Sequence, residues 1–249
     1  GAAIASSLSM AIGGIIAVWY MCFAARQLRP IRLKWSCRSL LYSIRNIGYQ
    51  CTIGMSALMG ECTMAVLALI GNYVFGAYLG DAGIGAFGIA CYYTPFVYMI
   101  GNAVAQSAQP IISYNYGCGD SCRVRSTLRV ALLAAVVCGG SVSTAFVFFP
   151  YQLVELFINT NEAAFPLAVK GFPLMATAFV FFIVNLTLIG YYQSVERVRP
   201  AMVFALLRGI FFLVPCFLVL PLWFDETGIW IALGMSEMLT TLCIIGYMW

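Results

Sequence analysis

A carboxylate inside a long apolar segment is the first group in this sequence that could do chemistry. Glu61 lies ten residues into an apolar run over residues 51–78, about 15 Å from the start of that run if it is helical. Steps of three or four residues put it on one helical face with small and polar residues, namely Gly54, Ala57, Ala65, Ala68 and Asn72. Small residues let helices pack closely, but packing does not account for a carboxylate in lipid. We therefore predict that Glu61, with Asn72, takes part in ion coupling as a carrier of a proton or a cation. A structural hydrogen-bonding role is the alternative.

Two more ionisable residues lie at membrane depth near the carboxyl end. Glu237 is nine residues into the apolar run 229–249, and Arg208 is about two turns into the run 201–223. Arg208 could neutralise Glu237 or extend to the cytosolic interface, and the sequence leaves both open. We assign Glu237 to ion coupling and Arg208 to a substrate cavity.

Polar side chains form a stripe along the apolar run 84–112. The stripe recurs at steps of three or four residues and consists of Tyr98, Asn102, Gln106 and Gln109. Amides are costly to bury in lipid without a partner, so this face should line a wet cavity or contact another helix. We predict that the stripe lines the substrate cavity.

An amide among aromatic side chains marks the run 166–192. Asn185 follows Phe179, Phe181 and Phe182. Aromatic walls around an amide suit flat, lipophilic, cationic ligands, although lipid-facing phenylalanines would give the same pattern. We assign Asn185 to both the substrate cavity and ion coupling.

Seven apolar stretches position these side chains. Each meets or nearly meets the roughly 20 residues needed to cross about 30 Å of hydrocarbon as a helix. They cover residues 1–22, 51–78, 84–112, 130–149, 166–192, 201–223 and 229–249. Lipid excludes unsatisfied backbone, and these runs are too long for barrel strands. The sequence therefore predicts an all-α polytopic membrane protein.

The loops between these stretches alternate between basic and acidic. The basic loops carry six Lys and Arg residues over residues 23–50, then Arg123, Arg125 and Arg129, then Arg197 and Arg199. The intervening loops carry Asp81, then Glu155 and Glu162, then Asp225 and Glu226. Because Lys and Arg stay on the cytoplasmic side, the basic loops are predicted to face the cytosol.

Composition excludes several classes of function. The chain is 63% hydrophobic and 9% charged, so it is not an ordinary soluble domain, and its basic residues are accounted for by cytosolic loops rather than nucleic acid. Without histidine there is no Ser-His-Asp triad or H-E-x-x-H zinc site, and we predict neither an enzyme, nor a cofactor, nor a metal site apart from sodium near Glu61. The chain begins inside an apolar run without Met, so we expect the C-terminal part of a longer protein.

A weak internal repeat suggests the domain organisation. Displacing the chain by 227 residues aligns the first apolar run with the last, with identical residues at six positions including Gly1/Gly228 and Tyr20/Tyr247. Both runs are predicted to start outside, so the repeat unit has six helices in parallel orientation, which is a transporter architecture. We predict that residues 1–22 are the last helix of a first lobe. Residues 23–50 would be a basic cytosolic or interfacial linker, and residues 51–249 a second lobe of six transmembrane helices.

Several segments together resemble one transporter family. They are MGECTMAVLALIGNYVFGAYLGDAGIGAFGI, GNAVAQSAQPIISYNYGCGD, GYYQSVERVRPAMVFALLRGIFFLVP and GIWIALGMSEMLTT. Over nearly its whole length the chain resembles the C-terminal half of multidrug and toxic compound extrusion (MATE) transporters, in particular the bacterial multidrug-efflux branch. The resemblance implies twelve helices in two six-helix lobes, a central cavity, and export driven by inward sodium or proton flow.

The resemblance also carries over single residues. The family acid in the first helix of the second lobe corresponds to Glu61, and the acid in the last helix to Glu237. Some members use an aspartate in the fourth helix for a sodium site, where this chain has Asn185, which argues against a site of that type.

The predicted function is a secondary antiporter that exports organic cations or drug-like amphiphiles in exchange for sodium or protons. Its partners would be these small molecules and membrane lipids, with no nucleic acid, and the full-length protein would be a monomer in the bacterial inner membrane. The alternatives are a lipid-linked saccharide flippase of the same superfamily, which a strongly basic cavity would mark, and a non-transporting membrane module.

Overall fold

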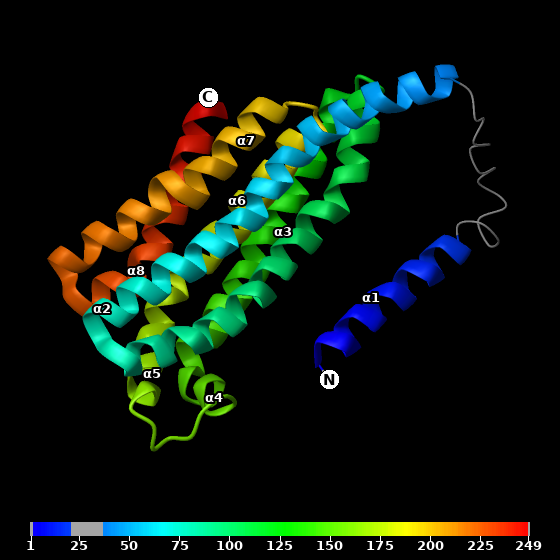
Figure 1. Cartoon of the computed structure of the whole chain (residues 1–249). Coiled ribbons are helices and arrows are strands. Elements are labelled where there is room, and N and C mark those ends of the chain that lie inside the picture. Colours follow the sequence, from blue (N-terminus) through cyan, green and yellow to red (C-terminus); the bar gives the residue numbers. More distant parts are fainter. Residues whose placement is uncertain (1, 21–36, 249) are drawn as a thin grey trace. The chain divides into compact units, whose positions relative to one another are not determined.

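The computed structural model describes residues 2–20 and 37–248, and these are helical with short connections and no strand. The helices, coloured along the chain in Figure 1, are α1 (Ala2–Trp19), α2 (Cys37–Gly117), α3 (Ser121–Phe148), α4 (Pro150–Glu155), α5 (Ala164–Met175), α6 (Thr177–Ser194), α7 (Val198–Leu206), the π-helical segment η3 (Leu207–Phe212) and α8 (Leu213–Met248). The predicted all-helical class is confirmed.

The chain divides into two compact units, Gly1–Tyr49 and Gln50–Trp249. The first unit contains α1 and the beginning of α2. Of the predicted basic linker, residues 23–36 lie outside the described residues, and residues 37–50 are the first turns of α2. The predicted role of residues 1–22 as the last helix of a first lobe stays a prediction.

The two longest helices each contain a reversal. Gly80 has φ 63° and ψ −154° inside α2, and Asp225 has φ 47° and ψ −130° inside α8. Glycine adopts positive φ at little steric cost, which explains Gly80, whereas Asp225 reaches it as a non-glycine residue. Each reversal turns one long helix into an antiparallel pair, at positions next to the acidic loops predicted around Asp81 and residues 225–226.

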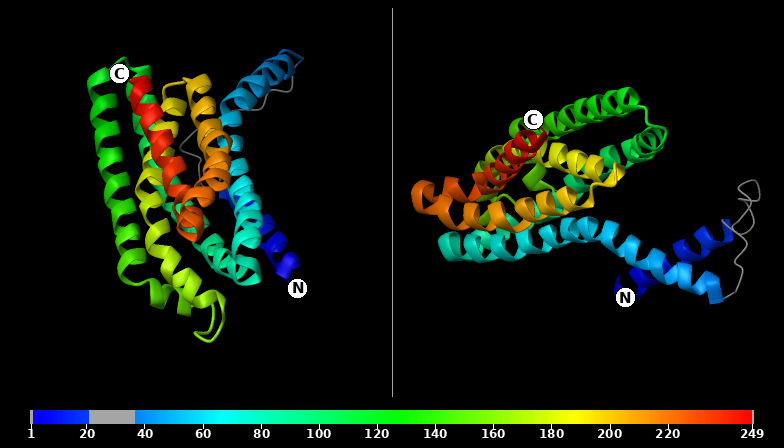
Figure 2. Two further views of the ribbon diagram at one scale, coloured as in Figure 1. Left: turned by 90° about the vertical axis from the view of Figure 1, so that its left-hand side faces the viewer. Right: turned by 90° about the horizontal axis from the view of Figure 1, so that it is seen from above.

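Four helical stretches within the described residues are long and apolar enough to cross a membrane, namely Leu58–Gly117, Ser121–Phe148, Thr177–Ser194 and Val198–Met248. Because Gly80 and Asp225 split the first and last stretches, these four stretches supply six crossings in the second unit. In Figure 1 the α2–α3 and α6–α7 turns and the chain end lie at the upper end of this unit, while the two reversals and the α4–α5 connection lie at the lower end; Figure 2 shows the same bundle from two other sides.

The predicted span 166–192 is interrupted. α5 ends at Met175 and α6 begins at Thr177, with Ala176 between them. Pro173 lies inside α5 and cannot donate a backbone hydrogen bond. At the break, the Ala176 carbonyl oxygen accepts from the Phe179 N–H over 3.2 Å and from the Ser143 hydroxyl of α3 over 2.7 Å.

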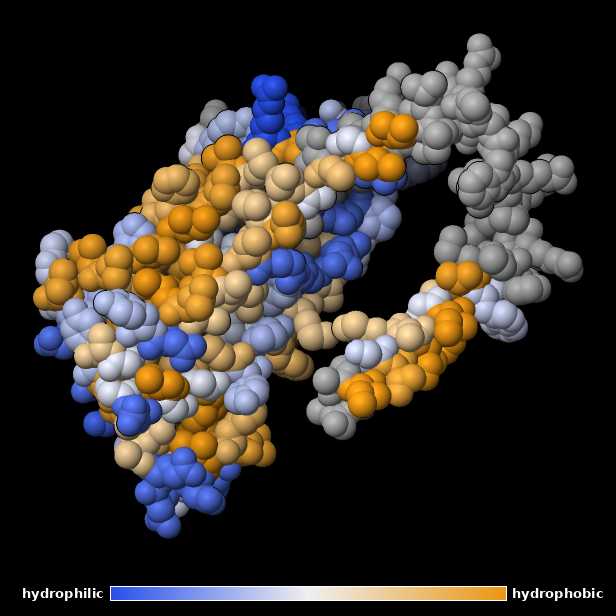
Figure 3. Space-filling view, viewed as in Figure 1, coloured by the Kyte–Doolittle hydropathy of each residue, from blue (hydrophilic) through white to orange (hydrophobic). Residues whose placement is uncertain are grey.

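The largest apolar core joins α2, α3, α5, α6 and α8. Its aromatic side chains meet edge to face or stacked, as for Phe146 against Phe179 at 4.8 Å and Phe75 against Trp230 at 4.8 Å between ring centroids. The outward surface of the same helices carries many exposed large apolar side chains, as a lipid-facing surface does. Figure 3 shows this as orange atoms over much of the visible face, with blue atoms gathered at the lower tip, where the α4–α5 connection lies.

Candidate functional site

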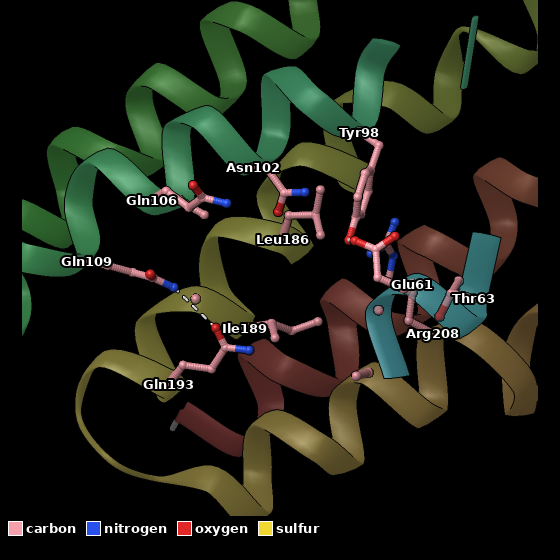
Figure 4. A pocket seen from close by; sticks show the side chains of 14 residues that line it. Glu61, Thr63, Tyr98, Asn102, Gln106, Gln109, Leu186, Ile189, Gln193 and Arg208 are labelled. Carbon is pink, nitrogen blue, oxygen red and sulfur yellow. Dashed lines mark hydrogen bonds between the residues drawn. The ribbon is translucent and has the colours of Figure 1, made fainter. Parts of the chain in front are cut away.

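A polar cavity of about 430 Å³ opens between both halves of α2, α6 and the α7–η3 segment. It is lined by Gly60, Glu61, Thr63, Tyr98, Asn102, Ala105, Gln106, Gln109, Leu186, Ile189, Gly190, Gln193, Ala205 and Arg208. Figure 4 shows the polar members turned toward one another from these elements. Six residues that the sequence nominated therefore share one cavity, namely Glu61, Tyr98, Asn102, Gln106, Gln109 and Arg208.

The α2 reversal explains why Glu61 and Tyr98 meet. Glu61 lies nineteen residues before Gly80 and Tyr98 eighteen residues after it, so antiparallel packing brings them to the same level. The Tyr98 hydroxyl donates to Glu61 Oε1 over 2.8 Å. Glu61 remains exposed to the cavity and makes no ion pair with any other described residue.

Arg208 and Glu237 form a buried ion pair. Arg208 Nε lies 2.7 Å from Glu237 Oε1, and the two side chains are 2% and 1% exposed. The structure thus selects between the two alternatives left by the sequence, because Arg208 neutralises Glu237 rather than extending to the interface. Removing two charges from solvent costs free energy, and hydrogen bonds to the remaining polar atoms of the pair reduce that cost.

Asn185 donates to the second carboxylate oxygen of Glu237, and Thr241 in turn donates to Asn185. Asn185 Nδ2 donates to Glu237 Oε2 over 2.7 Å and to the Glu237 carbonyl oxygen over 2.9 Å. The Thr241 hydroxyl lies 2.9 Å from Asn185 Oδ1, to which it donates. Asn185 is fully buried in this network and does not line the cavity, which differs from its predicted place in the substrate cavity.

The Arg208 guanidinium also lies over the ring of Phe182, with 4.1 Å between Cζ and the ring centroid. Its Nη2 is buried and has no hydrogen-bond partner among the described residues. Arg208 belongs to the π-helical segment η3, a type of segment often found at functional sites. Gly209 follows it, and a Cβ there would collide with the Thr63 hydroxyl, so glycine permits η3 to approach α2 beside Glu61.

Asn72 lies away from the cavity. It is exposed and donates to the Ala68 carbonyl oxygen over 2.8 Å, eleven residues and about 16 Å along α2 from Glu61. Conversely, Gln193 lines the cavity and accepts a 3.1 Å hydrogen bond from Gln109, although it is not among the predicted site residues. The sequence signal for Gln193 is a polar residue that directly follows the apolar run 166–192.

Comparison with known proteins identifies the family of this chain. The MatE family profile matches residues 57–218, which include the helices that surround the cavity. The chain belongs to the MatE family. The resemblance read from the sequence is thereby confirmed.

One curated protein and several solved structures are similar to this MatE chain. It is 28% identical over 168 residues to a probable multidrug resistance protein NorM of Rhizobium meliloti (strain 1021), covering 64% of the chain and 36% of that protein. Two solved structures share the fold. A MOP superfamily transporter from Pyrococcus furiosus, described as having a binding pocket of reverse polarity, matches with a TM-score of 0.86 at 14% identity. An outward-facing multidrug resistance MATE family transporter matches with a TM-score of 0.84 at 15% identity. In both cases 99% of this chain covers 55% of the other, so the chain spans about half the length of the solved relatives.

Proposed function

We propose that this MatE chain forms the ion-coupling half of a secondary antiporter, which exports organic cations or drug-like amphiphiles across a bacterial inner membrane in exchange for sodium or protons. The observation that carries the proposal is the charge balance of the cavity. Among the described residues that line it, Glu61 and Arg208 are the charged ones, and the charge of Arg208 is neutralised by Glu237. The cavity therefore presents the carboxylate of Glu61 without a paired cation, which favours positively charged ligands.

The shape and polarity of the cavity support both a coupling ion and an organic substrate. The Glu61 carboxylate and the Tyr98 hydroxyl supply oxygen atoms for sodium, and the carboxylate can bind a proton instead. Asn102, Gln106 and Gln109 supply hydrogen-bond donors and acceptors along the same wall. A volume of about 430 Å³ lies within the range of small-molecule sites.

Coupling would arise from competition at Glu61. An organic cation and the coupling ion both gain from the same carboxylate, so binding of one weakens binding of the other. If the two arrangements of the transporter bind these cations unequally, the ion gradient drives export by shifting their populations. A flippase for pyrophosphate-linked lipids is not favoured, because Arg208, the arginine among the described lining residues, is already paired with Glu237.

The test is ethidium efflux from liposomes that hold the intact protein, under a sodium gradient and separately under a proton gradient. We expect Glu61→Gln to lower gradient-driven efflux at least about tenfold while the protein remains folded, because the exchange removes the unpaired charge of the cavity. The matched control is Glu155→Gln, which removes an exposed acid of α4 outside the cavity and should leave efflux unchanged. Efflux that survives Glu61→Gln would show that coupling does not depend on Glu61.

A further inference from the structure

A second pocket lies at the end of the unit where the α2–α3 and α6–α7 turns come together. It has a volume of about 320 Å³ and shares no lining residue with the central cavity. It is lined by Tyr116, Gly119, Ser121, Val124, Arg125, Tyr191 and Arg197. Both turns lie at the upper end of the bundle in Figure 1.

The backbone of both turns is held by the same type of helix cap. Two residues after the end of α2, Gly119 has φ 75°, and two residues after the end of α6, Glu196 has φ 57°. In each case this residue and the next donate back to carbonyl oxygens three and five residues earlier, as in a Schellman motif. A small apolar cluster that includes Val124 and Val195 packs beneath the two turns. Local hydrogen bonds therefore hold the backbone of the two turns that border the pocket.

The arginines of this pocket have no acidic partner among the described residues. Arg125 and Arg197 are exposed and form no ion pair with any of them. Arg123, on the same turn, differs because its Nε lies 3.2 Å from Asp120 Oδ2. Two unpaired guanidinium groups at one pocket match the acceptor oxygens of a phosphate group.

The remaining lining groups favour the same ligand. Ser121, Tyr116 and Tyr191 carry hydroxyl groups that can donate hydrogen bonds to phosphate oxygens. Across residues 118–129 and 195–199 the chain has five arginines and only two acids, Asp120 and Glu196. The local field therefore attracts anions.

The position of the pocket indicates the source of the phosphate. The basic loops are predicted to face the cytosol, where the inner leaflet carries anionic lipids, and basic pockets between transmembrane helices on that side bind anionic headgroups. We propose that this pocket binds the phosphate of an anionic phospholipid, held between Arg125 and Arg197. The ligand would link the α2–α3 turn to the α6–α7 turn. This site does not depend on the proposed transport function, because its occupancy is measured without transport.

The test is native mass spectrometry of the intact protein, released from detergent after incubation with phosphatidylglycerol. Phosphatidylcholine, which carries no net charge, is the control lipid. We expect a saturable phosphatidylglycerol adduct and no equivalent phosphatidylcholine adduct. The double variant Arg125→Gln/Arg197→Gln should weaken phosphatidylglycerol binding at least about tenfold, because each lost charge-assisted contact alone can account for that factor. Arg123→Gln is the matched control, since Arg123 is already paired and does not line the pocket, and it should bind as the unaltered protein does.

Three outcomes would overturn the proposal. Equal weakening by Arg123→Gln would mean that diffuse surface charge attracts the lipid, and unchanged binding by the double variant would place the lipid elsewhere. A parallel titration with glycerol 3-phosphate, followed by thermal unfolding, distinguishes the source. If glycerol 3-phosphate stabilises the unaltered protein as strongly as the lipid does, and does not stabilise the double variant, the ligand is a soluble phosphate compound and the lipid assignment is wrong.

Discussion

Arg208 and Glu237 form an ion pair whose burial in the second unit costs the free energy of removing two charges from water. Two charges removed from water are stable only together, because each alone would lie unpaired in a region of low dielectric constant. Asn185 satisfies the second carboxylate oxygen and Phe182 covers the guanidinium. Because Arg208 is paired with Glu237, Glu61 is the unpaired charged group among the described residues that line the cavity.

We expect either single change, Arg208→Met or Glu237→Gln, to destabilise the protein by about 3–5 kcal/mol, because each leaves one buried charge unpaired. The double variant should be more stable than either single variant, since it removes both charges while the glutamine introduced at position 237 keeps a side chain of similar shape. Equilibrium unfolding in a fixed detergent measures all three. Strictly additive losses would show that the two side chains do not act as a pair.

At the scale of the elements, the backbones of α3 and α6 approach closely at Gly139. A Cβ added at Gly139 would lie 2.8 Å from Val180 Cα and 3.2 Å from the Phe179 carbonyl oxygen, both backbone atoms of α6. The next residue, Gly140, has open space at the same position. α6 also carries Asn185, so the approach at Gly139 helps to set where that amide points.

Gly139→Ala and Gly140→Ala add the same methyl group to neighbouring positions of α3. We expect Gly139→Ala to destabilise the protein by about 1–3 kcal/mol, since it forces two backbones apart. Gly140→Ala should stabilise it by up to about 1 kcal/mol, because alanine favours helix and nothing obstructs it. Thermal unfolding of the two variants side by side measures the contrast, and similar shifts for both would contradict the observed packing.

At the scale of the whole molecule, the two ends of the second unit differ in charge. The α2–α3 and α6–α7 turns are basic and lie at the same end of the bundle, while the connections at the other end carry Asp81, Glu155, Glu162, Asp225 and Glu226. From the positive-inside rule we expect the basic end to face the cytosol, which would put the proposed lipid pocket at the inner leaflet.

Cysteine labelling tests this orientation. Cys118 is free and exposed in the α2–α3 turn. In an otherwise cysteine-free protein, we expect a membrane-impermeant maleimide to label Cys118 in inside-out vesicles and not in intact cells. Asn161→Cys, in the α4–α5 connection, should show the opposite pattern. Labelling of Cys118 from the outside would reverse the assigned topology and remove the argument for an inner-leaflet lipid.

The sequence by itself determined the features that depend on neighbouring residues in the chain. Bilayer thickness sets the length of the apolar runs, the charge bias sets the predicted orientation, and helical periodicity put Tyr98, Asn102, Gln106 and Gln109 on one face. Glu61 was identified because a carboxylate in such a run has a high cost in lipid. These rules are local, so no knowledge of the fold was needed.

Only the tertiary structure decided which side chains meet. The pairing of Arg208 with Glu237 and the burial of Asn185 depend on the relative rotation and register of η3, α6 and α8. That register follows from packing between residues far apart in sequence, and from a π-helical turn at Arg208 that periodicity does not indicate. The second pocket likewise exists because two turns separated by about 75 residues lie together, which residue spacing alone cannot reveal.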